Sequence, residues 1–241
     1  MNFRIAVFYH IFYEDSLDDV LQELAVFDGK EVYFFINICI DTPNNEFISK
    51  VLKEKLENCF ITLSSNVGKD IGAKLNLVAL YLRLDLDCDC FVFLHDKKSL
   101  QALKSNSWKR DLLKILSTES IEKISNHFSD NNCGIVAANK YILEEEFRNY
   151  QFEGSTNSVF LLELMGSFNI NPPNYKYVAG TMFWVKVKPL LNFFNANCPL
   201  AIRASLEEGN VLDNYCGSRT HAWERLLSWI VTSQGYLIKG V

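Results

Sequence analysis

The sequence lacks a long apolar run, an interdomain linker and a glycine-rich dinucleotide motif. None of the apolar stretches in its 241 residues approaches the length of a membrane span, and no tract rich in Gly, Ser or Pro marks a domain boundary. G-x-G-x-x-G is missing after the first predicted strand, which argues against a dinucleotide oxidoreductase. Met1-Asn2-Phe3-Arg4 leads straight into an apolar run, so we expect no signal peptide.

The seven cysteines lack the spacing of a metal site. Cys88 and Cys90 form a C-x-C pair that is too tight for the usual zinc knuckle, and an odd number of cysteines disfavours a disulfide framework. We therefore expect a reduced cytoplasmic protein with buried free thiols.

Charge and composition limit the class of protein. The net charge of -5 and the pI near 5.5 argue against a nucleic-acid-binding surface. Hydrophobic residues make up 49% of the chain and aromatic residues 13%, which is enough for a substantial core. We expect a single domain over residues 1–241.

Strands and helices alternate in the first half of the sequence. Apolar runs predict strands over 4–10, 31–40, 59–63 and 90–94, and helical periodicity predicts helices over 16–27, 45–57 and 70–84. In the second half we expect helices over 107–116, 120–128, 159–168, 189–195 and 218–234, and strands over 133–138, 177–186 and 235–238. We expect a loop or irregular segment over 144–157 and a mixed segment with loops over 200–217. The pattern predicts an α/β fold with a parallel sheet covered by helices.

Two polar segments follow predicted strands. Ser65–Gly72 reads as a strand end that turns into a helix, and His95–Ser99 brings an acid and two lysines to the end of a buried strand. In an open α/β sheet, ligands bind at the carboxyl ends of the strands. Lysines beside helix-opening glycines suit a ligand that carries phosphate.

Five segments, in the same order along the chain, carry a family resemblance. They are Ile5–Tyr13, Asn66–Gly72, Leu94–Ser99, Ala179–Trp184 and His221–Leu226. Through them nearly the whole chain resembles the rhamnan synthesis F family of bacterial polysaccharide glycosyltransferases.

The resemblance implies a GT-A-like, Rossmann-type fold, with a mixed, mostly parallel sheet flanked by helices. It implies a nucleotide-binding half over residues 1–100 and an acceptor- or sugar-binding half over 101–241. It also implies transfer of a sugar, such as rhamnose or a related hexose, from a nucleotide-diphosphate donor to a lipid-linked or polysaccharide acceptor. This would serve cell-surface glycan synthesis at the inner face of the cytoplasmic membrane, alone or within a larger synthase complex, and with no nucleic-acid partner.

The resemblance also implies roles for residues of the first half. Asn66, Gly68 and Asp70 would contact the donor, with Asp70 at the ribose or base; as an alternative, Asp70 is a carboxylate favoured at a helix start. His10 and Tyr13, at the end of the first strand, would line the nucleotide pocket, although aromatic side chains there also suit core packing.

The residues at the end of the fourth strand differ from the motif that is usual in GT-A enzymes. GT-A enzymes usually carry an Asp-x-Asp metal motif there, and this chain has His95-Asp96-Lys97. Lys97 and Lys98 would pair with the diphosphate, and Asp96 would bind a sugar hydroxyl or act in catalysis, or hold a metal if any residue does. His95 would bind metal or phosphate, or be structural. No cofactor is assigned, and dependence on Mg²⁺ or Mn²⁺ is left open.

Asp85, Asp87 and Asp89 form a second acidic pattern, D-x-D-x-D. It precedes the fourth strand, so we expect it at the opposite edge of the sheet, as a solvated turn without a role at the site.

Candidate residues of the second half concern the sugar and the acceptor. Gly180 and Thr181 would approach the sugar, although a bulge explains the glycine equally well. Inversion needs a base for the acceptor hydroxyl, and Glu224 and Asp213 are the candidates. Glu224 also suits an exposed salt bridge, and Arg225 would bind diphosphate.

Two other functions remain open from the sequence. The missing Asp-x-Asp motif would suit a non-catalytic nucleotide- or glycan-binding scaffold of a polysaccharide assembly complex. The same fold would also suit a hydrolase of sugar nucleotides.

Overall fold

A seven-stranded sheet forms the centre of the molecule. The computed structural model describes residues 3–84, 86–96, 108–147, 157–212 and 217–241. The strand order is β3-β2-β1-β4-β8-β5-β9, and β8 runs antiparallel to both of its neighbours. The strands are β1 (Ile5–Ile11), β2 (Val32–Cys39), β3 (Cys59–Ser64), β4 (Cys90–His95), β5 (Cys133–Ala137), β8 (Phe183–Lys186) and β9 (Leu237–Gly240).

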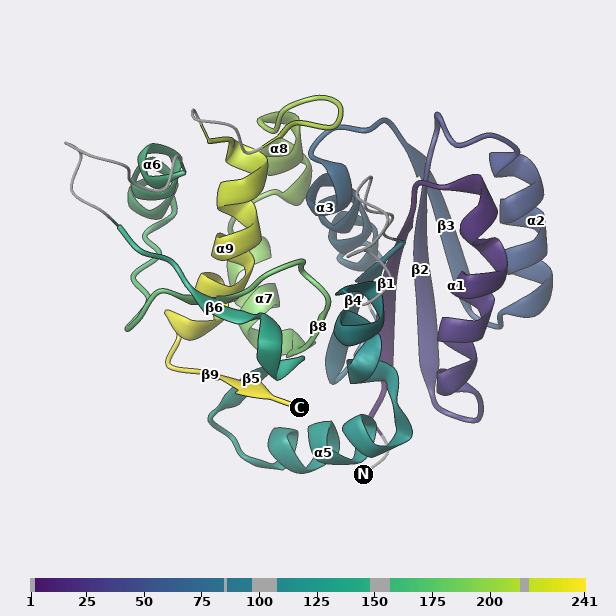
Figure 1. Cartoon of the computed structure of the whole chain (residues 1–241), viewed down its shortest axis with the longest axis horizontal. Coiled ribbons are helices and arrows are strands. Elements are labelled where there is room, and N and C mark those ends of the chain that lie inside the picture. Colours follow the sequence, from purple (N-terminus) through teal and green to yellow (C-terminus); the bar gives the residue numbers. More distant parts are fainter. Residues whose placement is uncertain (1–2, 85, 97–107, 148–156, 213–216) are drawn as a thin grey trace.

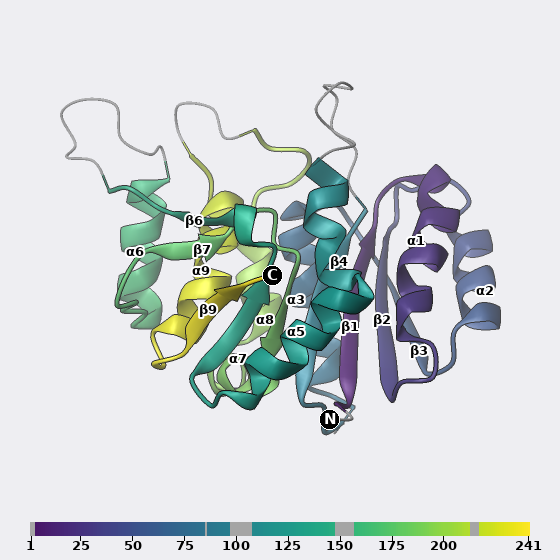
Figure 2. The ribbon, with the colours of Figure 1, turned by 60° about the horizontal axis from the view of Figure 1, so that its bottom comes forward.

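Helices cover both faces of the sheet (Figure 1). One face packs against α1 (Leu17–Leu24), α2 (Asn45–Lys55), the helical residues 108–112 and α5 (Thr118–Ser129). The other packs against α3 (Lys69–Tyr81), α7 (Val187–Phe194), α8 (Pro199–Ala204) and α9 (Arg219–Thr232), with α6 (Ser158–Phe168) against α9. Figures 1 and 2 show α2 at one end of the molecule and α6 at the other.

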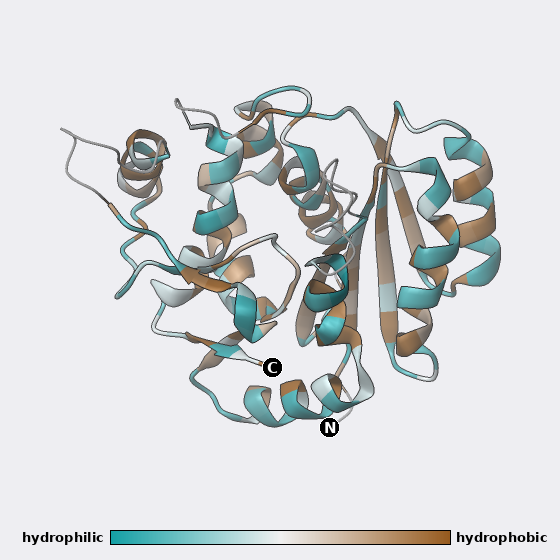
Figure 3. Ribbon diagram, viewed as in Figure 1, coloured by the Kyte–Doolittle hydropathy of each residue, from teal (hydrophilic) through white to brown (hydrophobic). Residues whose placement is uncertain are grey.

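Burial on both faces explains the composition of the central strands. All residues of β1 and β4 are buried, and strands covered on both sides read as continuous apolar runs. Figure 3 shows these strands in the colour of hydrophobic residues and the outer faces of α1 and α2 in that of hydrophilic ones. The expected α/β fold class, a mixed, mostly parallel sheet flanked by helices, is confirmed.

The first half follows the expected order of elements, with ends that differ by a few residues. The helix expected over 16–27 begins and ends in short 3-10 turns, η1 (Glu14–Ser16) and η2 (Ala25–Phe27). Likewise, the helix expected over 107–116 finishes as η3 (Leu113–Leu116).

The expected strand over 177–186 is wrong. It is two strands in different sheets: β7 (Lys176–Val178) pairs with β6 (Ile142–Glu144), just after η4 (Asn139–Tyr141), and β8 joins the main sheet. Gly180 and Thr181 lie between them, with φ values of 77° and 51°. Two consecutive residues in the left-handed region cannot continue a strand, so the chain turns there.

The expectation of buried thiols needs a correction. Cys39, Cys88, Cys90 and Cys133 are buried and free, Cys59 is partly buried, and Cys198 is exposed.

Within the described residues, no helix is both long and apolar enough to cross a bilayer.

Candidate functional site

A row of polar side chains crosses the carboxyl ends of four strands. His95 of β4 lies opposite His10 of β1, His10 opposite Asn37 of β2, and Asn37 opposite Thr62 of β3. Two residues earlier, the same face of the sheet carries the apolar row Phe93, Phe8, Phe35 and Phe60. Since side chains alternate along a strand, both rows face α3, and the core ends where the polar row begins.

His10 is held in place by this row. Its Nδ1 lies 3.1 Å from Nδ2 of Asn37, whose Oδ1 accepts from Thr62 and Asn76. The same Nδ1 also lies 3.2 Å from the backbone carbonyl oxygen of Asn37, so two contacts with Asn37 hold the ring. Burial lowers the pKa of His10 to about 4, so the ring is neutral at pH 7.

Lys74 forms the centre of a second, deeper cluster. Its side chain is 1% exposed, and its Nζ lies 2.7 Å from Oδ2 of Asp70, 2.5 Å from Oγ1 of Thr181 and 3.2 Å from Nδ1 of His95. The Thr181 hydroxyl donates to the same Oδ2 at 2.5 Å. Elements far apart in sequence, α3, β4 and the turn before β8, thus converge on one ammonium group.

This cluster keeps Asp70 ionised. Burial on its own would raise the pKa of Asp70, but the Lys74 ammonium, His95 and the hydrogen bonds from Lys74 and Thr181 hold it well below its usual value. Burial also lowers the pKa of Lys74, and the negative charge of Asp70 opposes that shift.

Asp96 ties the end of β4 to the chain that follows β1. Its carboxylate accepts hydrogen bonds from the backbone N–H groups of Phe12 and Tyr13, at 2.9 and 2.7 Å, and from the hydroxyl of Ser16 at 2.8 Å. The residue is 5% exposed. Burial raises its pKa to about 6, although the hydrogen bonds from Tyr13, Ser16 and Phe12 favour the charged form.

The turn between β3 and α3 is braced by the segment after α8. The Gly68 N–H donates to the Glu207 carbonyl at 2.8 Å, and the Gly209 N–H donates to the Asn66 carbonyl at 2.7 Å. Gly68 and Lys69 both have positive φ, 72° and 51°. A Cβ on Gly72 would lie 1.8 Å from the Val67 carbonyl oxygen, so the backbone packs too closely there for any side chain.

Glu224, on α9, is joined to the turn before β8. Its Oε1 accepts from the Gly180 N–H at 2.6 Å, and its Oε2 accepts from the guanidinium of Arg225 at 2.7 Å. Arg225 also bonds Glu145 at 2.8 Å and lies over the ring of Tyr177.

Two adjoining pockets open at this edge of the sheet and share Lys69, Asp70 and His95. The larger pocket, of about 260 Å³, is also lined by His10, Phe12, Tyr13, Asn66, Asp96, Asn210 and Leu212. The smaller pocket, of about 110 Å³, is also lined by Ile71, Gly180, Thr181, Thr220, His221 and Glu224.

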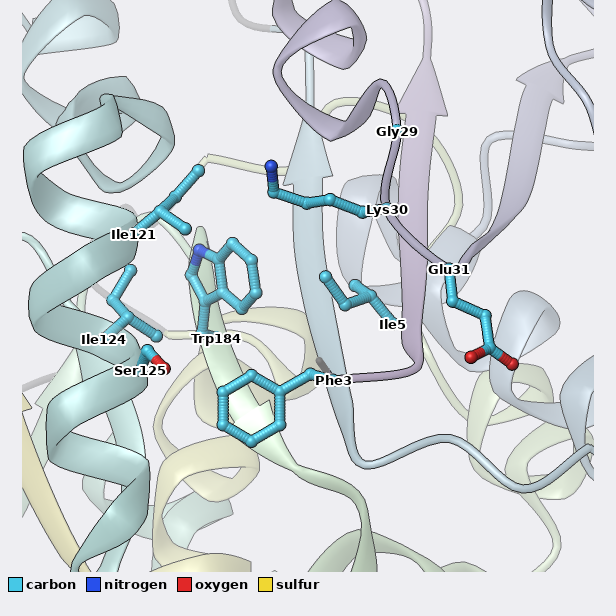
Figure 4. Close-up of a pocket in the computed structure, with 9 residues that line it drawn as sticks. All are labelled: Phe3, Ile5, Gly29, Lys30, Glu31, Ile121, Ile124, Ser125 and Trp184. Atoms are coloured by element: carbon cyan, nitrogen blue, oxygen red, sulfur yellow. The ribbon is translucent and has the colours of Figure 1, made fainter. Parts of the chain in front are cut away.

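A separate cavity of about 360 Å³, the amino-edge cavity, lies at the amino ends of the strands. Figure 4 shows Ile121 and Ile124 of α5 facing Trp184 and Ile5, with the Lys30 amine reaching above the indole. Its walls are mostly apolar, and the carboxylate of Glu31 turns away from it. It lacks the convergence of charged and polar groups seen at the carboxyl edge.

The chain has a family match across most of its length. The model of rhamnan synthesis protein F matches residues 1–236. The chain belongs to the rhamnan synthesis protein F family. No curated protein matches the chain.

Among solved structures, a similar one is "Mannosyltransferase PcManGT from Pyrobaculum calidifontis in complex with GDP-Man and Mn2+". The identity is 10% and the TM-score is 0.47. The match covers 100% of this chain and 55% of that one, so this family member spans about half the length of that protein's chain.

Most of the described residues that the sequence singled out for this family member come together. His10, Tyr13, Asn66, Asp70, His95 and Asp96 line the larger pocket, and Gly180, Thr181 and Glu224 line the smaller one. Gly68 supports the turn behind them, and Arg225 contacts Glu145 and Glu224 outside the lining of both pockets. Lys97, Lys98 and Asp213 lie outside the described residues. The roles of all these residues stay predictions.

The second acidic pattern is at the opposite edge, as expected. Asp89 accepts from the backbone N–H of Arg4 at 2.8 Å, and Asp87 pairs with the Arg4 guanidinium at 2.5 Å. Both precede β4, whose amino end they flank. Asp85 lies outside the described residues.

The carboxylates at the pockets do not fit a divalent ion as they stand. Asp96 accepts from three donors, Asp70 from Lys74 and Thr181, and Glu224 from two donors. Among the described residues, no group of three or more His, Cys, Asp or Glu is placed to hold a metal ion. A cation would have to displace several of these hydrogen bonds.

The candidate residues named from the sequence leave out two lysines of α3. Lys69 lines both pockets, and no ion-pair partner for it is found within the described part of the chain. Lys74 lies one helical turn after Asp70, on the same face of α3. This i, i+4 spacing was the available signal, but an ordinary surface pair has the same spacing, and its burial depends on Thr181, 107 residues away.

Proposed function

We propose that the chain is a glycosyltransferase that moves a hexose, such as rhamnose, from a nucleotide-diphosphate donor to a lipid-linked or polysaccharide acceptor. The observation that carries this proposal is the pair of adjoining pockets at the carboxyl edge of the sheet, which share Lys69, Asp70 and His95. Ligands of open α/β sheets bind at that edge. Family membership agrees with this reading.

The pockets suggest an orientation for the donor. The nucleoside would occupy the larger pocket, beside Phe12 and Tyr13, and the sugar would enter the smaller one, toward Thr181 and Glu224. The diphosphate would then lie at Lys69, the first residue of α3. A cation beside a helix N-terminus suits phosphate oxygens, and Lys97 and Lys98 would add charge there.

Glu224 is the described candidate for the base. The acceptor oxygen would attack the anomeric carbon, the bond from that carbon to the diphosphate oxygen would break, and Glu224 would take the hydroxyl proton. Its two hydrogen bonds fix the carboxylate, and each oxygen has a second lone pair for a further donor. Attack opposite the leaving group would invert the anomeric centre.

The place of the reaction follows from the acceptor. We propose that the product is a bacterial cell-surface glycan, such as the O-antigen of lipopolysaccharide, built at the cytoplasmic side of the membrane. A lipid-linked acceptor would bring the protein to that surface as a peripheral protein or as part of a synthase complex.

A panel of nucleotide sugars tests the proposal. Thermal unfolding is followed with GDP-, UDP- and dTDP-sugars, each with Mn²⁺, with Mg²⁺ and with a chelator. A specific donor should raise the melting temperature by mass action. If no nucleotide sugar does so under any of these conditions, the proposal fails.

Two matched lysine variants locate the donor. Lys69→Gln should weaken binding of the stabilising donor roughly tenfold, because it removes a charge-assisted contact to phosphate. Lys30→Gln, in the amino-edge cavity, is the control and should leave affinity unchanged. The opposite result would place the donor in the amino-edge cavity and contradict the proposal.

Product analysis separates the transferase from its alternatives. Sugar release that requires an acceptor supports the transferase, and Glu224→Gln should then abolish turnover while donor binding persists. Release without an acceptor supports a sugar-nucleotide hydrolase. Binding with no release under any condition supports a scaffold.

A further inference from the structure

Lys74 is a buried cation whose three N–H bonds all have acceptors. They point to Oδ2 of Asp70, Oγ1 of Thr181 and Nδ1 of His95, at 2.7, 2.5 and 3.2 Å. An ammonium group has three donors and no acceptor, so the coordination of Lys74 is complete. With its side chain 1% exposed, it has no surface left for a ligand and acts only through these neighbours.

Thr181 completes the arrangement at some conformational cost. Its φ of 51° is unusual for a β-branched residue. In that conformation its hydroxyl accepts from Lys74 and donates to Oδ2 of Asp70 at 2.5 Å. The turn before β8 is therefore held in a shape that serves the Asp70 carboxylate.

The two oxygens of Asp70 have different surroundings. Oδ2 receives both Lys74 and Thr181, whereas no residue in the described part of the chain donates to Oδ1. The side chain is 23% exposed and lines both pockets. One oxygen is used by the protein, and the other is left for whatever occupies the pockets.

We propose that Lys74 is a positioning residue, which together with Thr181 holds Oδ2 of Asp70 so that Oδ1 accepts a hydrogen bond from a hydroxyl group of the donor. This inference rests on the proposed function. It assigns the hydroxyl-bearing part of the donor, either ribose or the transferred sugar, to Asp70. The diphosphate must lie on the Lys69 side, because phosphate oxygens and an ionised carboxylate repel each other.

Removal of Lys74 should change the protonation of Asp70. The pKa of Asp70 is held well below its usual value chiefly by Lys74 acting against burial. Without Lys74, burial would dominate and the pKa would rise. The charged and titratable groups that face Asp70 from its neighbours are Lys69 and Lys74 of α3, His10 of β1, His95 of β4, and His221 and Glu224 of α9.

A double-mutant cycle tests the positioning role through binding. Affinities for the stabilising GDP-, UDP- or dTDP-sugar are measured calorimetrically for Lys74→Met, Asp70→Asn and the double variant. Each single change should weaken binding roughly tenfold, and the double variant should be no weaker than the single ones, because Lys74 acts through Asp70. Losses that multiply to roughly a hundredfold would show an independent effect and overturn the inference.

Carboxyl ¹³C NMR tests the same role without any ligand. In the wild type, the Asp70 carboxyl should stay ionised well below pH 3.8, the ordinary value. In Lys74→Met its titration midpoint should rise above the wild-type value. An unchanged midpoint overturns the inference even if nucleotide sugars bind. A raised midpoint in a protein that binds no nucleotide sugar refutes the proposed function and the hydroxyl assignment, and leaves only the Lys74–Asp70 coupling.

Thr181 provides a milder pair of variants in case Lys74→Met does not fold. Thr181→Val removes the hydroxyl while keeping shape and charge, and Thr181→Ser restores it. Thr181→Val should raise the Asp70 midpoint and weaken donor binding, whereas Thr181→Ser should match the wild type in both. Equal behaviour of the two variants would contradict the inference.

Discussion

Replacing Asp96 with alanine should destabilise the protein much more than loss of a surface carboxylate would. Asp96 is 5% exposed and accepts from the N–H groups of Phe12 and Tyr13 and from the Ser16 hydroxyl. Alanine would leave these three donors without their acceptor. The loop they belong to forms one wall of the larger pocket, so the same change would also loosen the pocket.

The size of the effect follows from two opposing terms. A hydrogen bond to a charged group contributes about 1.5–3 kcal/mol, so three of them contribute roughly 4.5–9 kcal/mol. Burial of the charge opposes them and outweighs them in the pKa, which is raised from 3.8 to about 6. Alanine removes the buried charge together with the hydrogen bonds, so we expect Asp96→Ala to lower the free energy of unfolding by less than that sum, by about 2–5 kcal/mol.

Equilibrium urea unfolding at pH 7 measures this change. Asp89→Ala is the matched control, because Asp89 lies at the other end of the same strand and accepts one backbone hydrogen bond, from Arg4, near the surface. It should cost less than about 1 kcal/mol. Equal stabilities for the two variants would refute the reasoning. If Mn²⁺ stabilised the wild type but not Asp96→Ala, Asp96 would be a metal ligand instead.

Two further predictions concern the same edge of the sheet. Gly72→Ala should lower the free energy of unfolding by about 3 kcal/mol or more, because its Cβ would lie 1.8 Å from a carbonyl oxygen; thermal unfolding measures this, and Gly166→Ala, in open space on α6, should be neutral or stabilising. The folded-state pKa of Asp70 lies below its unfolded value of 3.8, so its contribution to stability is present above that pH and is lost below it. Below pH 4, the free energy of unfolding should therefore fall less steeply with decreasing pH in Asp70→Asn than in the wild type. Parallel curves for the two proteins would contradict this.

The sequence predicted the sheet's first four strands from their apolar runs, which are almost fully buried in β1, β2 and β4 and partly buried in the edge strand β3. Runs such as Phe91–Leu94 are apolar throughout, and the polar residue that ends each run marks the carboxyl edge. The segments around Asn66–Asp70 and His95–Asp96 were predicted at this edge for that reason, and Asn66, Asp70, His95 and Asp96 line one pocket.

Sequence periodicity could not find contacts that depend on the turn before β8. Residues 177–186 form one unbroken β-favouring run, yet positive φ at Gly180 and Thr181 separates two strands. That turn brings Thr181 to Lys74 and Gly180 to Glu224. Such pairs depend on tertiary packing, and no local pattern in the chain encodes them.

Asp96 follows β4 and Asp70 follows the β3–α3 turn. The comparison of the two shows how packing gives different properties to residues of the same type. Both are largely buried, which raises the pKa of an acid, but within the described residues only Asp70 has a buried ammonium within hydrogen-bonding distance. The pKa of Asp70 therefore falls and that of Asp96 rises to about 6. Both oxygens of Asp96 accept hydrogen bonds from backbone or hydroxyl donors, whereas one oxygen of Asp70 remains at the junction of the pockets. A carboxylate that binds a sugar hydroxyl has to be ionised, held in a fixed orientation and able to accept a further hydrogen bond. Of these two residues, Asp70 meets all three conditions.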